Sequence, residues 1–109
     1  RAELVRQATS HLPNVRVEPF KGLLVDFAKE LDATVVVKGL RAITDFEYEF
    51  QMAMLNFRLA PELETFFVMS SPDYMYVSSS IAKELASLHG STEGIVPPVV
   101  GQALANRLG

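Results

Sequence analysis

Two short runs of β-branched and aromatic residues constrain this chain more than any other feature. Residues 33–37 read Ala-Thr-Val-Val-Val, and residues 65–69 read Thr-Phe-Phe-Val-Met. Neither run alternates apolar with polar residues, which is typical of parallel strands that are covered on both faces. A helix-like stretch, residues 45–59, lies between the two runs. Because parallel neighbours need a long crossover, the order strand, helix, strand predicts an α/β fold.

The remaining segments extend the same alternation along the chain. Apolar residues recur at helical spacing in residues 4–12, in residues 24–31 and again after Pro98. Residues 15–18 alternate apolar with polar side chains and stop at Pro19, which predicts a further, half-exposed strand. We therefore expect the order αβαβαβα in a single domain over residues 1–109. The first helical pattern begins without a capping residue, so we expect the chain to start inside a longer domain.

Composition excludes several classes of partner and site. Ten Lys and Arg against thirteen Asp and Glu give a net charge of −3, so we expect no nucleic-acid partner. Small anions need only a local cluster of donors and are still allowed. The chain has no Cys, which excludes disulfides and thiolate metal sites and fits a cytoplasmic protein. No apolar run approaches the roughly 20 residues that a membrane span requires, so no membrane partner is expected.

The expected topology brings three segments to one edge of the sheet. Ligands of such folds bind beyond the carboxyl ends of the parallel strands. Residues 20–24, 38–41 and 70–80 would all meet at that edge. Residues 38–41 read Lys-Gly-Leu-Arg, where the glycine allows close approach of a ligand and Arg41 can grip a phosphate. An ordinary strand exit with solvated charges explains the same tetrapeptide.

Three consecutive serines precede an apolar run at helical spacing. One of Ser78, Ser79 and Ser80 is enough to cap a helix. No Glu or Gln follows three residues after any of them, so no capping box forms, and Lys83 adds positive charge to the helix start. An anion, phosphate above all, could complete that helix start. A plain cap with two solvated hydroxyls is the alternative, and the local pattern leaves both open.

The stretch 46–59 carries two apolar stripes on nearly opposite sides of a helix. One face can cover the sheet and the other then needs another layer or subunit, so we expect a homo-oligomer contact there. Glu49 lies between the stripes near the helix start, where a solvated carboxylate that favours the helix dipole is the ordinary interpretation. The stripes are Phe46, Phe50, Ala53 and Phe57 on one side and Tyr48, Met52, Leu55 and Leu59 on the other.

Two motifs together resemble a known family. The stretch KGLRAITDFEYEFQM, residues 38–52, resembles the signature of bacterial phosphopantetheine adenylyltransferase, and residues 74–80, YMYVSSS, resemble its second ATP-binding segment. The serines alone are shared by many nucleotidyltransferases, whereas the long first stretch is close to diagnostic. The resemblance runs over the whole chain. It implies a Rossmann-like nucleotidyltransferase fold, a parallel sheet with helices on both faces, and a homohexamer.

The resemblance also implies a reaction and a set of site residues. The reaction is transfer of adenylyl from ATP to 4′-phosphopantetheine, giving dephospho-CoA and pyrophosphate in coenzyme A biosynthesis. Arg41 and Ser79 would hold the charge of the departing pyrophosphate, while Lys38 and the backbone at Leu23 and Leu24 would bind the phosphopantetheine side. The ATP contacts would be Gly39, Leu40, Arg41, Glu49, Tyr74, Met75, Tyr76, Val77, Ser78, Ser79 and Ser80.

The same resemblance implies a role for Mg²⁺ and a low activity of this chain by itself. Mg²⁺ would sit on ATP phosphates and water, because no residues here form a carboxylate cage and no protein metal site is expected. The family's first strand, its phosphate-binding turn with a T/HxGH histidine pattern and a nearby lysine do not occur in this sequence. We therefore expect the chain to be the C-terminal two-thirds of the enzyme and nearly inactive alone. The alternative is a non-catalytic module that binds nucleotide or CoA and self-associates.

Overall fold

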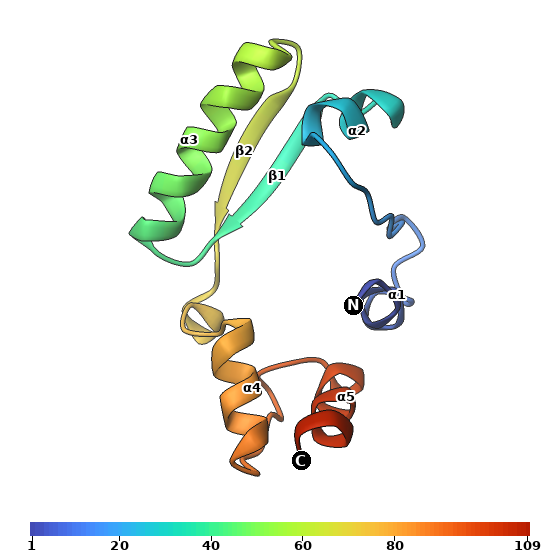
Figure 1. Ribbon diagram of the computed structural model, residues 1–109, viewed down its shortest axis with the longest axis vertical. Coiled ribbons are helices and arrows are strands. Elements are labelled where there is room, and N and C mark those ends of the chain that lie inside the picture. The colour runs from blue at the N-terminus through green and yellow to red at the C-terminus, as the bar shows by residue number, and fades with distance from the viewer. The chain divides into compact units, whose positions relative to one another are not determined.

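The computed structural model describes the backbone of residues 1–109 and every side chain except those of residues 43 and 44 (Figure 1). The chain divides into two compact units, Phe20–Tyr76 and a second made of Arg1–Pro19 with Val77–Gly109. Each unit is described by itself, and the expectation of a single domain stays a prediction. The elements in chain order are α1 (Ala2–Ala8), α2 (Leu24–Glu30), β1 (Val35–Leu40), α3 (Ile43–Leu59), β2 (Glu64–Met69), the 3-10 helix η1 (Pro72–Tyr74), α4 (Ser79–Ser87) and α5 (Pro98–Leu108).

The unit Phe20–Tyr76 is built on two parallel strands. β1 and β2 pair from Val35 opposite Glu64 to Leu40 opposite Met69, with α3 as the crossover (Figure 1). The ladder continues one step beyond its end, where the Ser70 N–H donates to the Leu40 carbonyl at 2.8 Å. β-branched residues fill this pleated surface well, and α3 ends where Pro61 follows Ala60. The predicted strand, helix and strand are therefore confirmed.

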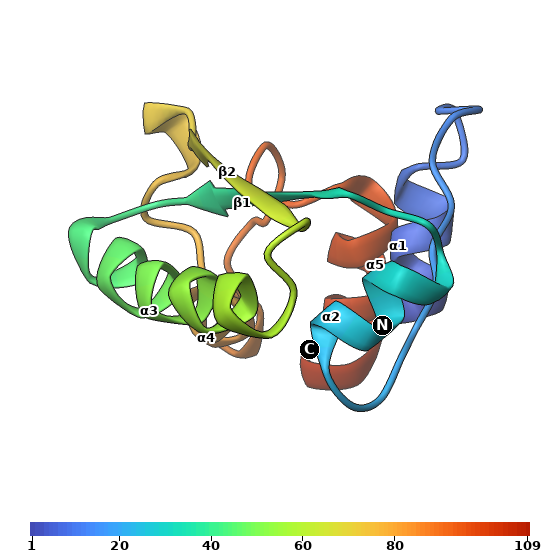
Figure 2. The same cartoon turned by 90° about the horizontal axis from the view of Figure 1, so that it is seen from above.

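Both helices of this unit lie on the same face of the strands. Figure 2 shows α2 and α3 together on one side of β1 and β2. Phe46 of α3 packs edge-on against Phe67 of β2, with ring centroids 5.6 Å apart. Val36 of β1 packs against the cluster that includes Val25 of α2. In the described part of this unit, no helix covers the other, bare face of the strands. The unit therefore supplies one of the two predicted helical layers. The bare face presents Val37, Phe66 and Val68, which are 64%, 51% and 54% exposed.

The face of α3 that is buried is not one of its two apolar stripes. Its least exposed described positions form a strip of acidic, amide and alanine residues that shares only Ala53 with the stripes. The stripes themselves stay exposed, with Phe50 at 47% and Leu55 at 46%. Small side chains allow the helix to approach its neighbours closely, and Glu49 finds a cation on β1. The expectation that an apolar stripe covers the sheet is therefore wrong for most of the helix. The buried strip is Asp45, Glu49, Ala53, Asn56 and, just past the helix end, Ala60.

The predicted strand at residues 15–18 does not form. An ion pair between Arg16 and Glu18, 3.3 Å long, joins side chains two positions apart, as in an extended chain. The backbone has no strand beside it, and Pro19 has no N–H to offer a ladder. Alternation therefore predicted the side-chain pattern of this segment but not a hydrogen-bonded neighbour.

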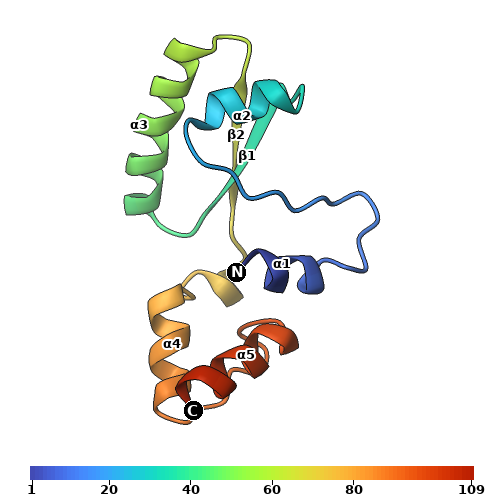
Figure 3. The same ribbon diagram turned by 45° about the vertical axis from the view of Figure 1, so that its right-hand side comes forward.

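The second unit is helical. α5 packs against both α1 and α4, as Figure 3 shows for α4 and α5. Ala82 and Ala86, four residues apart on α4, are its buried residues and permit close packing. α5 begins at Pro98, where proline is well suited to the first helical turn, as predicted. In the part of the chain that the structure describes, no helix is both long and apolar enough to cross a membrane.

Candidate functional site

The Lys-Gly-Leu-Arg segment forms the end of β1 rather than a loop after it. Lys38, Gly39 and Leu40 are the last three residues of the strand, and Arg41 is the first residue beyond it. The strand extends to residue 40 because its ladder with β2 continues past the β-branched run. This corrects the expected strand end at residue 37. The segment nonetheless lies at the carboxyl edge, where ligands of parallel α/β folds bind.

Lys38 and Glu49 form an ion pair across the covered face of the sheet. The Lys38 Nζ lies 3.4 Å from a Glu49 carboxylate oxygen, and the two side chains are 36% and 25% exposed. The interpretation of Glu49 as a plainly solvated carboxylate is therefore wrong. The family resemblance assigned Lys38 to phosphopantetheine and Glu49 to ATP. In the structure the two side chains are in contact.

Arg41 is held by Asp45 in the first turn of α3. The Arg41 Nε donates to Asp45 Oδ2 at 3.1 Å, and the Arg41 backbone N–H donates to the same oxygen at 3.3 Å. Sequence analysis did not single out Asp45. The sequence offered only a weak signal, since an acid in the first turn of a helix is favoured by the helix dipole whether or not Arg41 lies beside it.

Gly39 and Leu40 differ in what their side chains could offer a ligand. Leu40 is 2% exposed, so its side chain belongs to the core and only its backbone could contact a ligand. A Cβ built on Gly39 would meet no atom within 4 Å, so the fold does not require glycine there. Alternation along the strand puts Gly39 on the bare face, opposite the face of Lys38 and Leu40.

The segment after β2 belongs to the same carboxyl edge as Arg41, because the strands are parallel. Ser71 caps η1 by accepting a hydrogen bond from the Asp73 N–H at 3.3 Å. Tyr74, the last residue of η1, is 50% exposed. The next two residues, Met75 and Tyr76, are 38% and 61% exposed. These are three of the predicted ATP contacts, and they lie in the same unit as Arg41.

The serines cap α4 as expected. Ser78 is the N-cap residue, and its Oγ accepts a hydrogen bond from the Ile81 N–H at 3.2 Å. Ser79 and Ser80 are the first two helical residues and are exposed. The serines belong to the unit made of Arg1–Pro19 and Val77–Gly109, whereas Lys38–Arg41 belong to the other unit, so the predicted meeting of the two segments stays a prediction.

The structure does not bring Leu23 and Leu24 to the edge where Arg41 lies. α2 packs at the amino end of the strands, where its Val25 contacts Leu63, the residue before β2. Stacking of Phe20 on Phe27, with ring centroids 4.4 Å apart, ties the entering chain to that helix. Of the segments expected at this edge, residues 38–41 and 70–76 therefore lie there, and the substrate contacts of Leu23 and Leu24 stay predictions.

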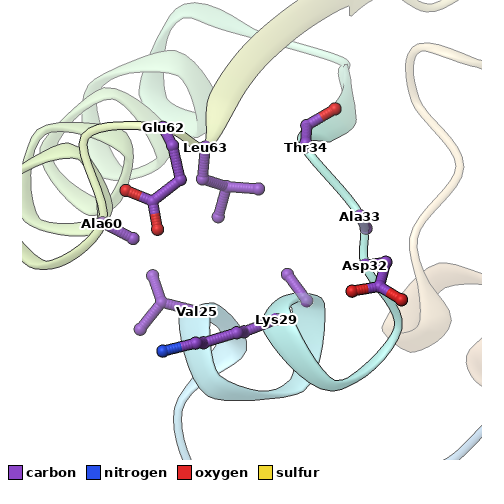
Figure 4. A pocket seen from close by; sticks show the side chains of 9 residues that line it. Val25, Lys29, Asp32, Ala33, Thr34, Ala60, Glu62 and Leu63 are labelled. Atoms are coloured by element: carbon purple, nitrogen blue, oxygen red, sulfur yellow. The ribbon is translucent and has the colours of Figure 1, made fainter.

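A shallow hollow of about 190 Å³ lies beside α2 at this amino end. Figure 4 shows side chains from α2 and from the turns ahead of β1 and β2 lining it. Its floor is apolar and its rim carries one cation and two acids. Sequence analysis did not predict it. The lining residues are Val25, Ala28, Lys29, Asp32, Ala33, Thr34, Ala60, Glu62 and Leu63.

Among the described side chains, no three His, Asp or Glu residues lie close enough to hold a metal ion. Of the side chains that the structure describes, Asn56 is the one polar side chain that is buried. It is 8% exposed and lies on the same strip of α3 as Glu49. Sequence analysis placed it on a polar strip but gave no reason for it to be buried.

Comparison with known proteins defines the class of this domain. Residues 1–85 match a family model described as cytidylyltransferase-like. With the parallel strands, the crossover helix and the cations at the carboxyl edge, this match confirms the predicted Rossmann-like nucleotidyltransferase fold.

Similarity to individual proteins narrows the class. The chain is 51% identical over 109 residues to a phosphopantetheine adenylyltransferase of Moorella thermoacetica and 50% identical over 109 residues to one of Heliobacterium modesticaldum. A third, of Caldanaerobacter subterraneus, is 48% identical over 107 residues. The matches cover 98 to 100% of this chain and 65 to 68% of the relatives. The chain belongs to the phosphopantetheine adenylyltransferase family.

Proposed function

We propose that this protein transfers the adenylyl group of ATP to 4′-phosphopantetheine, with dephospho-CoA and pyrophosphate as products, in coenzyme A biosynthesis. One observation carries the proposal. Three relatives with this name are 48 to 51% identical to the chain over 107 to 109 residues. The grouping of Lys38, Gly39 and Arg41 at the carboxyl edge of β1 supports it. The alternative, a non-catalytic nucleotide-binding and self-association module, is not favoured by these relatives.

The reaction needs no protein nucleophile. A phosphate oxygen of phosphopantetheine attacks the α-phosphorus of ATP, a new P–O bond forms, and the bond to the bridging oxygen of the β-phosphate breaks. Positioning and charge stabilisation then carry the catalysis. Arg41 and Ser79 would hold the charge that builds up on the leaving pyrophosphate. Mg²⁺ would arrive on the ATP phosphates, since the described residues offer no carboxylate cage for it.

Lys38 and Glu49 would serve different substrates from one ion pair. Lys38 would bind the phosphate side of phosphopantetheine, and Glu49 would contact ATP together with Leu40, the segment 74–76 and the start of α4. Their 3.4 Å separation supports adjacent subsites, because a ligand that reaches one of the two side chains lies near the other.

Gly39 would let the nucleotide approach the backbone of β1. The open space at its Cβ position supports this role, because the glycine is then not explained by packing inside the protein. We expect Gly39→Ala to leave the free energy of unfolding nearly unchanged and to weaken ATP binding at least tenfold, since a methyl group would occupy the space of the ligand. Urea unfolding and calorimetry with ATP measure the two effects separately.

Replacement of Arg41 tests the proposed chemistry. Arg41→Ala in the whole protein should raise the barrier by about 2–4 kcal/mol, the effect of losing one charge-stabilising donor. Pyrophosphate release from ATP and phosphopantetheine is the assay. Arg58→Ala, at an exposed position of α3, is the matched control and should retain the wild-type rate. An unchanged rate in Arg41→Ala would remove Arg41 from the site, and a wild-type protein without turnover would remove the function.

We further propose a cytoplasmic homo-oligomer, a hexamer by family resemblance, with α3 at the contact. The exposed apolar stripes of α3 support self-association, with Tyr48 at 62% and Phe57 at 57% exposed. Phe57→Glu should shift the sedimentation coefficient towards that of a smaller assembly, whereas Glu47→Gln on the same helix should not. A sedimentation coefficient unaffected by Phe57→Glu would place the contact elsewhere.

A further inference from the structure

We propose that Asp45 is a positioning residue for nucleotide binding, which acts by orienting the guanidinium of Arg41. This inference rests on the proposed function of Arg41 as a contact to the ATP phosphates. The carrying observation is that one Asp45 oxygen accepts from both the side chain and the backbone of Arg41, at 3.1 and 3.3 Å.

The pair differs from an ordinary salt bridge along a helix. Arg41 lies outside α3, one residue before its N-cap Ala42, whereas Asp45 lies in the first turn. A contact between them therefore fixes the exit from β1 relative to the start of the helix. Asp45 is also in the position where a negative charge is favoured by the unpaired N–H groups of a helix start.

Contact at Nε determines the orientation of the whole guanidinium. The group is planar and presents its five N–H donors in a fixed fork, so holding one edge sets the direction of the other donors. The same carboxylate oxygen also holds the Arg41 backbone N–H, so the side chain is anchored at both its root and its head. Pre-orientation of this kind lowers the entropy that a flexible arginine loses when it binds phosphate.

The contact lies in a partly buried setting. The side chains of Arg41 and Asp45 are 41% and 31% exposed, so water competes for them less than on an open surface. Leu40, the preceding residue, is 2% exposed and fixes the strand end from which Arg41 departs. Arg41 thus departs from a strand end that is packed in the core.

The test is a set of variants in the whole protein, with ATP affinity measured by calorimetry and kinetics measured by pyrophosphate release. Asp45→Asn keeps a hydrogen-bond acceptor of the same shape but removes the charge. We expect it to weaken ATP binding roughly tenfold while the KM for phosphopantetheine changes less than twofold. Asp45→Glu should recover part of that affinity. Glu47→Gln, an exposed acid on the same helix, is the matched control and should bind ATP as the wild type does.

A double variant separates positioning from a structural role. If Asp45 acts through Arg41, Asp45→Asn should weaken ATP binding less than twofold when Arg41 is already alanine. The Arg41 Nε–H signal in ¹⁵N NMR should shift and lose protection from exchange in Asp45→Asn. Additive losses, or unchanged ATP affinity in Asp45→Asn, would overturn the proposal. A wild-type protein that binds no ATP would overturn the proposed function as well, so the two failures are distinct.

Discussion

Separating Lys38 from Glu49 should destabilise the fold by an amount that the structure allows us to estimate. At 3.4 Å, two unit charges attract by about 1.2 kcal/mol in bulk water and by about 5 kcal/mol at an effective dielectric constant of 20. The side chains are 36% and 25% exposed, so the attraction between the two charges lies between these two energies. Desolvation and the ordering of two long side chains offset most of the attraction. We therefore expect a net coupling free energy of about 1 kcal/mol.

The assay is a double-mutant cycle with Lys38→Met, Glu49→Gln and the double variant, each measured by urea unfolding. The chain contains an exposed comparison pair in Arg6 and Glu3, which are also 3.4 Å apart but 49% and 68% exposed. Because both of its side chains are largely exposed and lie three positions apart on α1, this pair should couple by only about 0.3 kcal/mol. Equal couplings in the two cycles, or a smaller one for Lys38 and Glu49, would refute the reasoning that partial burial strengthens this pair.

Further predictions concern the serine cap, the core and one turn, each measured by urea unfolding. Ser78→Ala should cost about 1 kcal/mol because it removes the acceptor for the Ile81 N–H, whereas Ser80→Ala should cost little; equal losses would mean that Ser78 is not the cap. Leu63→Ala should cost about 2–4 kcal/mol because Leu63 is 4% exposed, and Leu88→Ala, at 73% exposure, under about 0.5 kcal/mol. Gly22→Ala should cost about 1 kcal/mol because φ is +98°, and no loss would show that the turn can relax.

The class of fold could be predicted because its signals are local. Continuous β-branched runs, a crossover of helical length and a serine before a helix are each readable within a few residues. Ser78 illustrates this, since its capping bond spans only three positions. The strand at residues 15–18 failed because pairing depends on a neighbour that the alternation cannot specify.

The sequence identified residues of the candidate site better than it identified the contacts between them. Periodicity shows which residues of α3 share a face, but it does not tell which face is buried when two stripes are apolar. The choice depended on the small side chain of Ala53 and on the attraction between Glu49 and Lys38, which are 11 positions apart in sequence. Asp45 was missed for the same reason, because its importance comes from a contact rather than from its own pattern.

Adjacent residues of β1 point to opposite sides of the strand, Lys38 to the helical layer and Gly39 to the bare face. Whether the number of residues between Thr34 and Lys38 is odd or even therefore decides which face Lys38 occupies. Deleting one residue between Thr34 and Lys38 would send the ammonium group to the wrong side and offer Glu49 a hydrogen atom instead, whereas deleting two would restore the alternation. Length changes in this strand should thus be tolerated, if at all, only in even numbers.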